Sequence, residues 1–159
     1  MRSKNSGKVN IPVLTHCQIR SHRCKRPDEA RSPVSVSSGT ILVIDDEQTE
    51  VDVSRLMLEE MGCHVLCAET GKKAIEITRT YEGDITISLL DIKLTDMEGT
   101  EIYHAIRDAR PNMKVLVCSG YSLEGAAQEI IDAGAHGFIQ KPFTFESLST
   151  KLDEAFQFG

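Results

Sequence analysis

Four short apolar runs in this chain are each followed by polar residues. The runs are Ile41–Ile44, Ile85–Leu90, Val115–Cys118 and Gly137–Gln140. Runs this short and this apolar are typical of parallel strands that are covered by helices on both faces. Ligands of such folds bind beyond the carboxyl ends of the strands. We therefore expect the polar residues at these ends to converge in one crevice; they are Asp45, Asp46, Asp91, Ser119 and Lys141.

Helical patterns separate the runs, so strand and helix alternate five times from Thr40 onward. Helices are predicted at residues 47–61, 71–81, 98–109, 123–133 and from the N-cap Thr144 onward, with a short extra strand at 64–67. Val53 and Phe145 are among the side chains expected to face the core. Five such units predict one α/β domain with a doubly wound, five-stranded parallel sheet. We expect no effector domain after it.

The charge of the chain is divided unevenly. Residues 1–39 hold 8 of the 18 Lys and Arg residues but only 2 of the 24 Asp and Glu residues. This segment has few periodic apolar positions, so it is predicted to be a basic, flexible arm, and residues 40–159 the folded domain. The acidic domain argues against nucleic-acid binding by the folded part. For the basic arm two interpretations stay open: it contacts nucleic acid or a membrane surface, or it is a solvated tail.

Several other classes of protein find no support in the sequence. No apolar run approaches the roughly 20 residues that a membrane span requires, so no membrane partner is expected. No apolar segment follows the N-terminal basic residues, as it would in a secretory signal. The 5 cysteines lack the spacing of a disulfide framework, which favours reduced thiols and a cytoplasmic location. His16, Cys17, His22 and Cys24 match no standard zinc spacing.

Four longer motifs surround the strand ends, namely Ile41–Glu47, Leu90–Gly99, Ser119–Gly120 and Phe138–Phe143. Together they resemble the receiver domain of two-component response regulators over residues 40–158. The resemblance is closer still to the receivers that end hybrid sensor histidine kinases. It implies a flavodoxin-like sheet with strand order 2-1-3-4-5. It also implies a phosphoprotein switch in phosphorelay signal transduction rather than an enzyme acting on other substrates.

The resemblance assigns the acidic residues to a phosphoacceptor and a metal site. Asp91 would be the phosphoacceptor, attacking a phosphohistidine or a small phosphodonor. Asp45, Asp46 and Asp91 would offer Mg²⁺ the hard oxygen ligands that it prefers, and the backbone carbonyl of Lys93 would complete the set. The metal would neutralise charge on the phosphoryl group, which three carboxylates would otherwise repel.

The remaining motif residues would act on the phosphoryl group or report its presence. Lys141 would pair with one phosphoryl oxygen, and Ser119 would donate a hydrogen bond to another. Ser119 and Phe138 would form the switch, moving together on phosphorylation. Lys93 and Tyr121 stand at the two variable positions that tune the phosphoryl lifetime in this family.

Two details extend the comparison with the family. Thr95 departs from the family pattern, in which a proline usually follows the acceptor by four residues, so the loop there is expected to be looser. The Lys141–Pro142 peptide is expected to be cis. The implied partner is a histidine kinase or a histidine phosphotransfer protein, with a homodimer through the 119–158 face as a further possibility.

Two alternatives compete with the phosphoacceptor switch. A Mg²⁺-dependent phosphatase or hydrolase of a related α/β fold would also use an aspartate nucleophile. That class needs a second carboxylate two residues later as general acid, and this chain has Lys93 there. A receiver that serves only as a non-phosphorylated docking module is the other alternative, and the intact set of polar residues argues against it.

Overall fold

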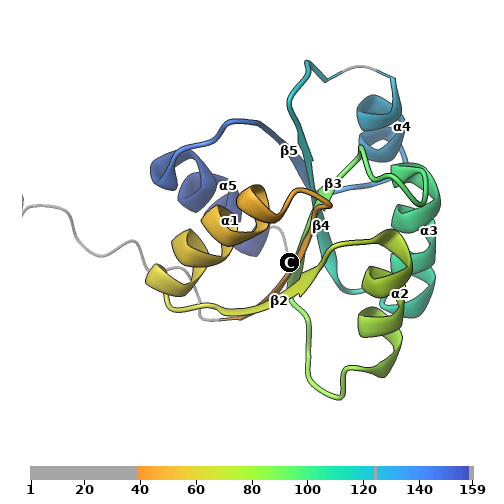
Figure 1. The fold of residues 1–159 in the computed structure, drawn as a ribbon, viewed down its shortest axis with the longest axis horizontal. Helices are drawn as coiled ribbons and strands as arrows, with labels where there is room; N and C mark the ends of the chain where they lie inside the picture. Colours follow the sequence, from red (N-terminus) through yellow and green to blue (C-terminus); the bar gives the residue numbers. More distant parts are fainter. Residues whose placement is uncertain (1–38, 124, 158–159) are drawn as a thin grey trace, which may run out of the picture. The chain divides into compact units, whose positions relative to one another are not determined.

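The structure, a computed structural model, describes residues 39–123 and 125–157. The basic arm predicted for residues 1–39 lies almost wholly outside this range. The described part holds five parallel strands, β1 (Thr40–Ile44), β2 (His64–Ala68), β3 (Ile87–Asp91), β4 (Lys114–Ser119) and β5 (Gly137–Gln140). They form one sheet in the order β2-β1-β3-β4-β5 (Figure 1). The predicted doubly wound sheet and its strand order are confirmed.

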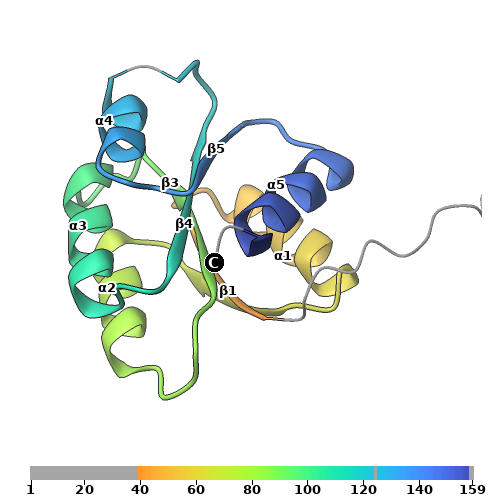
Figure 2. The same cartoon turned by 180° about the vertical axis from the view of Figure 1, so that it is seen from behind.

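Five helices connect the strands and cover both faces of the sheet. They are α1 (Gln48–Glu60), α2 (Gly71–Thr80), α3 (Gly99–Ala109), α4 (Ala126–Asp132) and α5 (Phe145–Gln157). Helices α1 and α5 lie on one face, and α2, α3 and α4 lie on the other, as the two opposite views show (Figures 1 and 2). Right-handed crossovers between parallel strands produce this arrangement when the strand order reverses beside β1.

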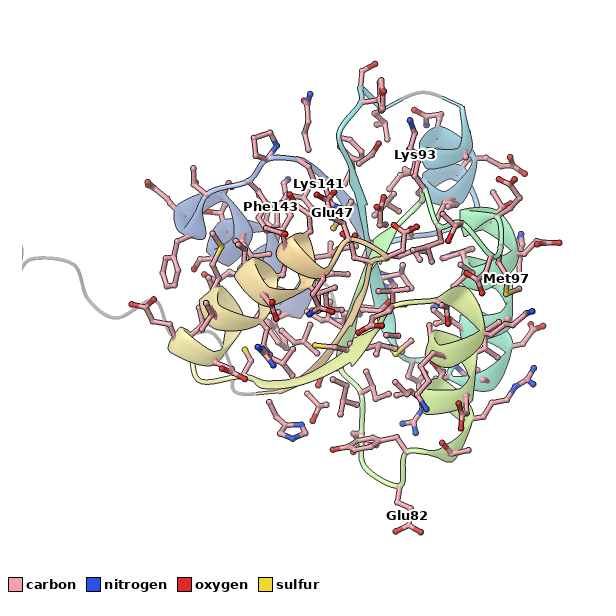
Figure 3. The ribbon with its side chains drawn as sticks, viewed as in Figure 1. Glu47, Glu82, Lys93, Met97, Lys141 and Phe143 are labelled. Carbon is pink, nitrogen blue, oxygen red and sulfur yellow. The ribbon has the colours of Figure 1, made fainter. Side chains whose placement is uncertain are left out.

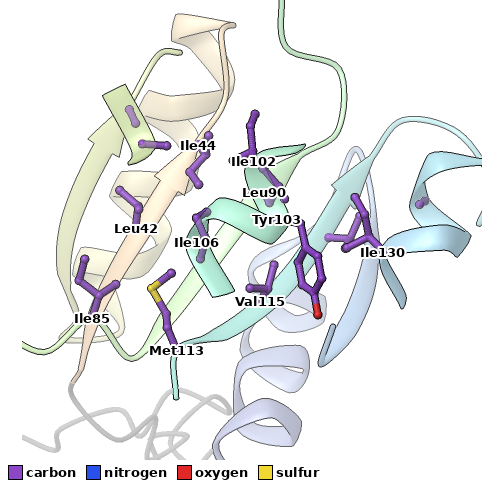
Figure 4. Close-up of a cluster of buried hydrophobic side chains, with 14 residues drawn as sticks. Leu42, Ile44, Ile85, Leu90, Ile102, Tyr103, Ile106, Met113, Val115 and Ile130 are labelled. Carbon is purple, nitrogen blue, oxygen red and sulfur yellow. The ribbon is translucent and has the colours of Figure 1, made fainter. Parts of the chain in front are cut away.

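The central strands are mostly apolar because both of their faces are buried. Side chains alternate between faces along a strand. Leu42 therefore joins the core under α2, α3 and α4 (Figure 4), whereas its neighbour Ile41 joins the core under α1 and α5. Both side chains have 0% exposure. Of the helices in the described range, none is long and apolar enough to cross a membrane.

Side-chain caps begin two of the helices. The hydroxyl of Thr70 accepts a hydrogen bond from the Lys73 N–H at 3.1 Å at the start of α2. The hydroxyl of Thr144 accepts one from the Ser147 N–H at 3.2 Å at the start of α5. Each cap satisfies an N–H group that has no partner within its helix. The predicted N-cap at Thr144 is confirmed.

Two side chains that we expected in the core are exposed. The buried residues of α1 are Val51, Ser54 and Leu58, and Met57 and Met61 pack against the same core, whereas Val53 is 42% exposed. Phe145, the first residue of α5, is 40% exposed. The polar Ser54 takes the core position next to Val53, which is why apolar character alone chose the wrong residue there.

The boundaries of two elements also differ from the prediction. Helix α4 begins at Ala126, not at residue 123, because Gly125 has φ +57° and ψ −126°, a conformation outside the helical region. Strand β3 begins at Ile87, two residues after the start of the apolar run, and it ends with Asp91. Ile85 is nevertheless buried, which explains the apolar residue ahead of the strand.

Candidate functional site

The register of the sheet brings the predicted site residues to one edge. Ile44 of β1 pairs with Leu90 of β3, so the next residues, Asp45 and Asp91, follow adjacent strands. Asp91 in turn pairs with Cys118 of β4, one residue before Ser119. The carboxyl ends of three neighbouring strands thus supply side chains to the same crevice.

Three carboxylates gather in this crevice. One oxygen from each of Asp45, Asp46 and Asp91 lies within 4.8 Å of the others. Asp45 is buried, and the other two are partly exposed. A compact set of carboxylate oxygens with one open side suits a hard divalent cation such as Mg²⁺, which keeps some of its waters. The residues present therefore fit the metal that the sequence led us to expect.

The three carboxylates differ in their protein partners. Asp45 uses both oxygens within the protein, since Oδ1 accepts the Glu47 N–H at 2.9 Å and Oδ2 pairs with the Lys141 ammonium. Asp91 Oδ1 accepts the Lys93 N–H at 3.2 Å. Among the described residues, Asp46 has neither an ion-pair partner nor a hydrogen-bond donor for its carboxylate. Asp46 is therefore the carboxylate most free to bind a cation.

Lys141 brings the only ammonium group that pairs with these carboxylates in the described range. It follows β5 directly, and its N–H donates to the carbonyl of Ser119 at 2.7 Å. Its Nζ pairs with Asp45 and lies 3.2 Å from Asp91 Oδ2. Burial acts to lower the pKa of Lys141, but the contacts with Asp45 and Asp91 outweigh it, so the pKa lies above its usual value.

The peptide bond between Lys141 and Pro142 is cis, as the family resemblance led us to expect. In Figure 3, Lys141 and Glu47 lie near the same end of the sheet as Lys93. Cys118 lines the small cavity beneath this cluster. Burial raises the pKa of its thiol far above the usual value, so the thiol stays protonated and does not compete with Asp91 as a nucleophile.

Two loops flank the open side of the crevice, one after β3 and one after β4. The buried hydroxyl of Ser119 accepts the Tyr121 N–H at 3.2 Å. The ammonium of Lys93 lies 3.7 Å from the centre of the Tyr121 ring, a cation–π contact that joins the loops. Phe138 packs against the core under α2, α3 and α4. All of the predicted site residues except Phe138 thus lie at or beside the crevice.

One residue near the site was not singled out by its sequence. Asp96, in the loop after β3, accepts hydrogen bonds from two N–H groups at the start of α2. These partners are 24 and 25 residues away along the chain. No local motif indicates a cap that is supplied from another part of the sequence.

Comparison with known proteins identifies relatives along the folded part of the chain. It is 29% identical over 116 residues to a cyclic di-GMP phosphodiesterase of Thermotoga maritima, 32% over 115 residues to the transcriptional regulatory protein ZraR of Klebsiella oxytoca, and 28% over 117 residues to the sensor kinase CckA of Brucella abortus. These matches cover 73%, 72% and 74% of this chain but only 30%, 26% and 12% of those proteins. The chain therefore spans less than a third of each relative.

Solved structures similar to this chain include receiver domains. A response regulator receiver domain protein from Clostridium thermocellum superposes with a TM-score of 0.70 at 28% identity, covering 75% of this chain and 94% of that one. A CheY-like receiver from Methanospirillum hungatei gives 0.67 at 32% identity, covering 77% and 100%. Residues 41–153 match the family described as the response regulator receiver domain. The chain therefore belongs to the response regulator receiver domain family of two-component systems.

Proposed function

We propose that Asp91 accepts a phosphoryl group from a histidine kinase or a histidine phosphotransfer protein in a Mg²⁺-dependent reaction. The observation that carries this proposal is the position of the Asp91 carboxylate among charged neighbours. Asp91 lies at the carboxyl end of the central strand, in a cluster with Asp45 and Asp46 and 3.2 Å from the Lys141 ammonium. A nucleophile between a cation-binding set and a fixed positive charge suits phosphoryl transfer, which depends chiefly on positioning and charge neutralisation.

The reaction itself requires little covalent chemistry from the protein. An oxygen of Asp91 forms a bond to phosphorus while the phosphorus–nitrogen bond of the phosphohistidine breaks, and the electron pair returns to the imidazole. Mg²⁺ held by Asp45, Asp46, Asp91 and the Lys93 carbonyl would supply positive charge at the phosphoryl oxygens. Lys141 would exchange a carboxylate contact for a phosphoryl oxygen, and the Ser119 hydroxyl would donate a hydrogen bond to another phosphoryl oxygen.

The product would then alter the face built from residues 119–158. Ser119 is buried, and its Oγ accepts the Tyr121 N–H, so turning toward a phosphoryl group would break this bond. Phe138 is partly buried, and it would move into the space that Ser119 leaves. The change of one hydrogen bond at the site would in this way alter side-chain packing at the surface. This face is our candidate for binding an output partner or a second copy of the chain.

The relatives bear on the biological setting. Receiver domains interact with histidine kinases or phosphotransfer proteins, and one relative is named as a sensor kinase. We propose that this receiver serves in a phosphorelay in the cytoplasm and is related most closely to those at the end of hybrid kinases. The motifs Ser119–Ser122 and Gly137–Phe143 support that assignment.

Phosphorylation by acetyl phosphate tests the proposal. Intact-mass measurement after incubation with acetyl phosphate and Mg²⁺ should show one added phosphoryl group on the wild-type protein and none on Asp91→Asn. The matched control is Asp132→Asn, which removes an exposed aspartate of α4. It should be modified like the wild type. Equal modification of Asp91→Asn would overturn the assignment.

The same experiment separates the two alternatives. A docking module would take up no phosphoryl group on any residue. A hydrolase would release phosphate from many equivalents of a phosphate ester, whereas a receiver should take up one equivalent and release it slowly. Lys93, in the place of the general acid that the hydrolase class uses, favours slow release.

A further inference from the structure

The Asp96 carboxylate joins the loop after β3 to the N-terminus of α2. Oδ1 accepts the Gly71 N–H at 2.8 Å, and Oδ2 accepts the Lys72 N–H at 3.1 Å. The Thr70 hydroxyl accepts the third N–H of the helix, that of Lys73. The first N–H groups of a helix lack intrahelical partners and attract negative charge. Two of the three caps thus come from a loop that is distant in sequence, and they fasten that loop to the helix.

Close packing beside these hydrogen bonds sets the position of the loop. A Cβ atom on Gly71 would lie 2.7 Å from Ile102 Cδ1 and 3.0 Å from Met97 Cβ, so only glycine admits both neighbours. Met97, which is labelled in Figure 3, follows Asp96 directly and rests against the buried start of α2. The loop after β3, α2 and α3 therefore meet at one junction.

The same loop carries a proposed metal ligand at its other end. The Lys93 N–H donates to Asp91 Oδ1, and Lys93 forms an antiparallel bridge with Glu98. Between these anchors the chain has Thr95, where the family usually has a proline, so no ring restricts φ at that position. Within the described residues, Asp96 is the one side chain of residues 92–98 that hydrogen-bonds to a different helix or strand.

We propose that Asp96 is a positioning residue for the magnesium site, because it fastens to α2 the loop that carries the Lys93 carbonyl. A proline at position 95 would restrict the backbone of this loop, and Thr95 does not. The hydrogen bonds of Asp96 to the start of α2 provide a restraint in its place. This inference rests on the proposed function, in which Lys93 completes the metal ligands. A consequence is that α2 is linked to the metal site, since Mg²⁺ would order the loop and the loop would hold the helix terminus.

A simple helix cap would have a different signature. If Asp96 served only to begin α2, removing it should resemble removing the other cap, the Thr70 hydroxyl, which in the described part of the chain hydrogen-bonds within α2 and not to the loop. Thr70→Ala is therefore the matched control. Asp96→Ala also removes a negative charge, so Glu98→Gln, which removes a carboxylate of the same loop without loss of a cap, controls for charge. Asp96→Asn keeps the shape and one acceptor oxygen.

Backbone-amide NMR titration with MgCl₂ gives the dissociation constant without any phosphoryl transfer. Asp96→Ala should raise the Mg²⁺ dissociation constant by about threefold to tenfold, as loss of an outer contact of a metal site does. Asp96→Asn should raise it less, and Thr70→Ala and Glu98→Gln should leave it near the wild-type value. In metal-free protein, amide hydrogen exchange at residues 92–98 should be faster in Asp96→Ala but not in Thr70→Ala.

The outcomes separate the inference from the function on which it rests. Wild-type protein that binds Mg²⁺, together with an unchanged constant for Asp96→Ala, would overturn the inference alone. An equal loss of affinity in Thr70→Ala or Glu98→Gln would overturn it too, because helix stability or charge would then explain the effect. Wild-type protein that binds no Mg²⁺ would overturn the proposed metal site and the inference with it.

Discussion

The ammonium of Lys141 lies 3.2 Å from the carboxylate of Asp91, although the two residues are 50 positions apart. The same ammonium pairs with Asp45, so one positive charge is shared between two of the three clustered carboxylates. Carboxylates held this close repel one another. Lys141 therefore serves in the metal-free protein as the counter-charge that Mg²⁺ would provide in the metal-bound one.

Replacing Lys141 by methionine should destabilise the metal-free protein. The variant keeps an apolar stem but leaves two buried or partly buried carboxylates without their partner, which should cost about 1–3 kcal/mol. Added Mg²⁺ should restore more stability to the variant than to the wild type, because the cation no longer competes with an ammonium. Urea unfolding in EDTA and in saturating Mg²⁺ measures both effects.

The pH dependence of this difference follows from the raised pKa of Lys141. A raised pKa in the folded state stabilises the protein at every pH below the ordinary value of 10.5, and this contribution is lost as the pH rises through the higher folded value. The difference in unfolding free energy between wild type and Lys141→Met should thus be constant near neutrality and shrink in strong alkali. A gap that closes near neutral pH would contradict the ion-pair explanation.

Asp46→Asn should have the opposite effect on the metal-free protein. Because the Asp46 carboxylate has no cationic or hydrogen-bonding partner among the described residues, its removal relieves repulsion and should stabilise the apo fold by up to about 1 kcal/mol. The stabilisation by Mg²⁺ should disappear. Thermal unfolding with and without MgCl₂ checks both parts, with Asp132→Asn as control. Undiminished stabilisation by Mg²⁺ would mean that the metal binds elsewhere.

The convergence of the site could be predicted because it depends on strand ends alone. Apolar runs locate the strands, and parallel strands place Asp45, Asp91 and Lys141 at one edge whatever the details of packing. The exposure of Val53 could not be predicted in this way, because the core position next to it in α1 is taken by the polar Ser54. Tertiary packing overrides a local pattern at such positions.

Contacts between distant segments were the other gap in the prediction. The Asp96 cap joins residues about 25 positions apart, and nothing in the sequence near Asp96 indicates its partner. The contact between Lys93 and Tyr121 likewise depends on the conformations of two loops. The start of α4 was predicted three residues too early because Gly125, just before the helix, adopts a non-helical conformation, and glycine permits several conformations that its neighbours do not reveal.

Gly99→Ala should displace the start of α3 and lower the free energy of unfolding. A Cβ atom at this position would lie 2.9 Å from the Cα atom of Ile92, a backbone atom next to Asp91 that cannot turn aside. Overpacking of this kind costs about 1–3 kcal/mol. Gly120→Ala is the control, since its Cβ would meet nothing within 4 Å. Urea unfolding should separate the two variants, and equal stability would show that the loop after Asp91 adapts freely.

The difference in unfolding free energy between Asp96→Asn and the wild type should depend on pH in the acidic range. The hydrogen bond from Gly71 is the largest cause that holds the pKa of Asp96 below its ordinary value of 3.8. The carboxylate therefore stabilises the fold above pH 3.8, and this contribution is lost as the pH falls through the lower folded value. Unfolding in urea across this range should show the gap between the proteins narrowing in acid; a gap unaffected by pH would argue against the charged cap.

Lys93 and Tyr121 should control the lifetime of the phosphorylated state as a pair. Hydrolysis of the acyl phosphate needs a water in line with the bond between Asp91 and phosphorus, and both side chains lie beside that crevice. The ammonium of Lys93 lies 3.7 Å from the ring centre, so we propose that Lys93 and the ring together cover the approach of this water. Lys93→Asn should shorten the lifetime severalfold, an effect of about 1 kcal/mol on the barrier.

A double-mutant cycle distinguishes joint from separate action. If the cation–π contact holds the cover in place, Tyr121→Ala should shorten the lifetime as well, and the double variant should decay little faster than either single one. Lys93→Arg keeps a cation that stacks on the ring and should decay like the wild type. Decay followed by intact mass after removal of acetyl phosphate gives the rates of all five proteins, the wild type and the four variants. Effects that multiply in the double variant would mean that each side chain acts alone, and an unchanged lifetime in Lys93→Asn would leave the tuning to Tyr121.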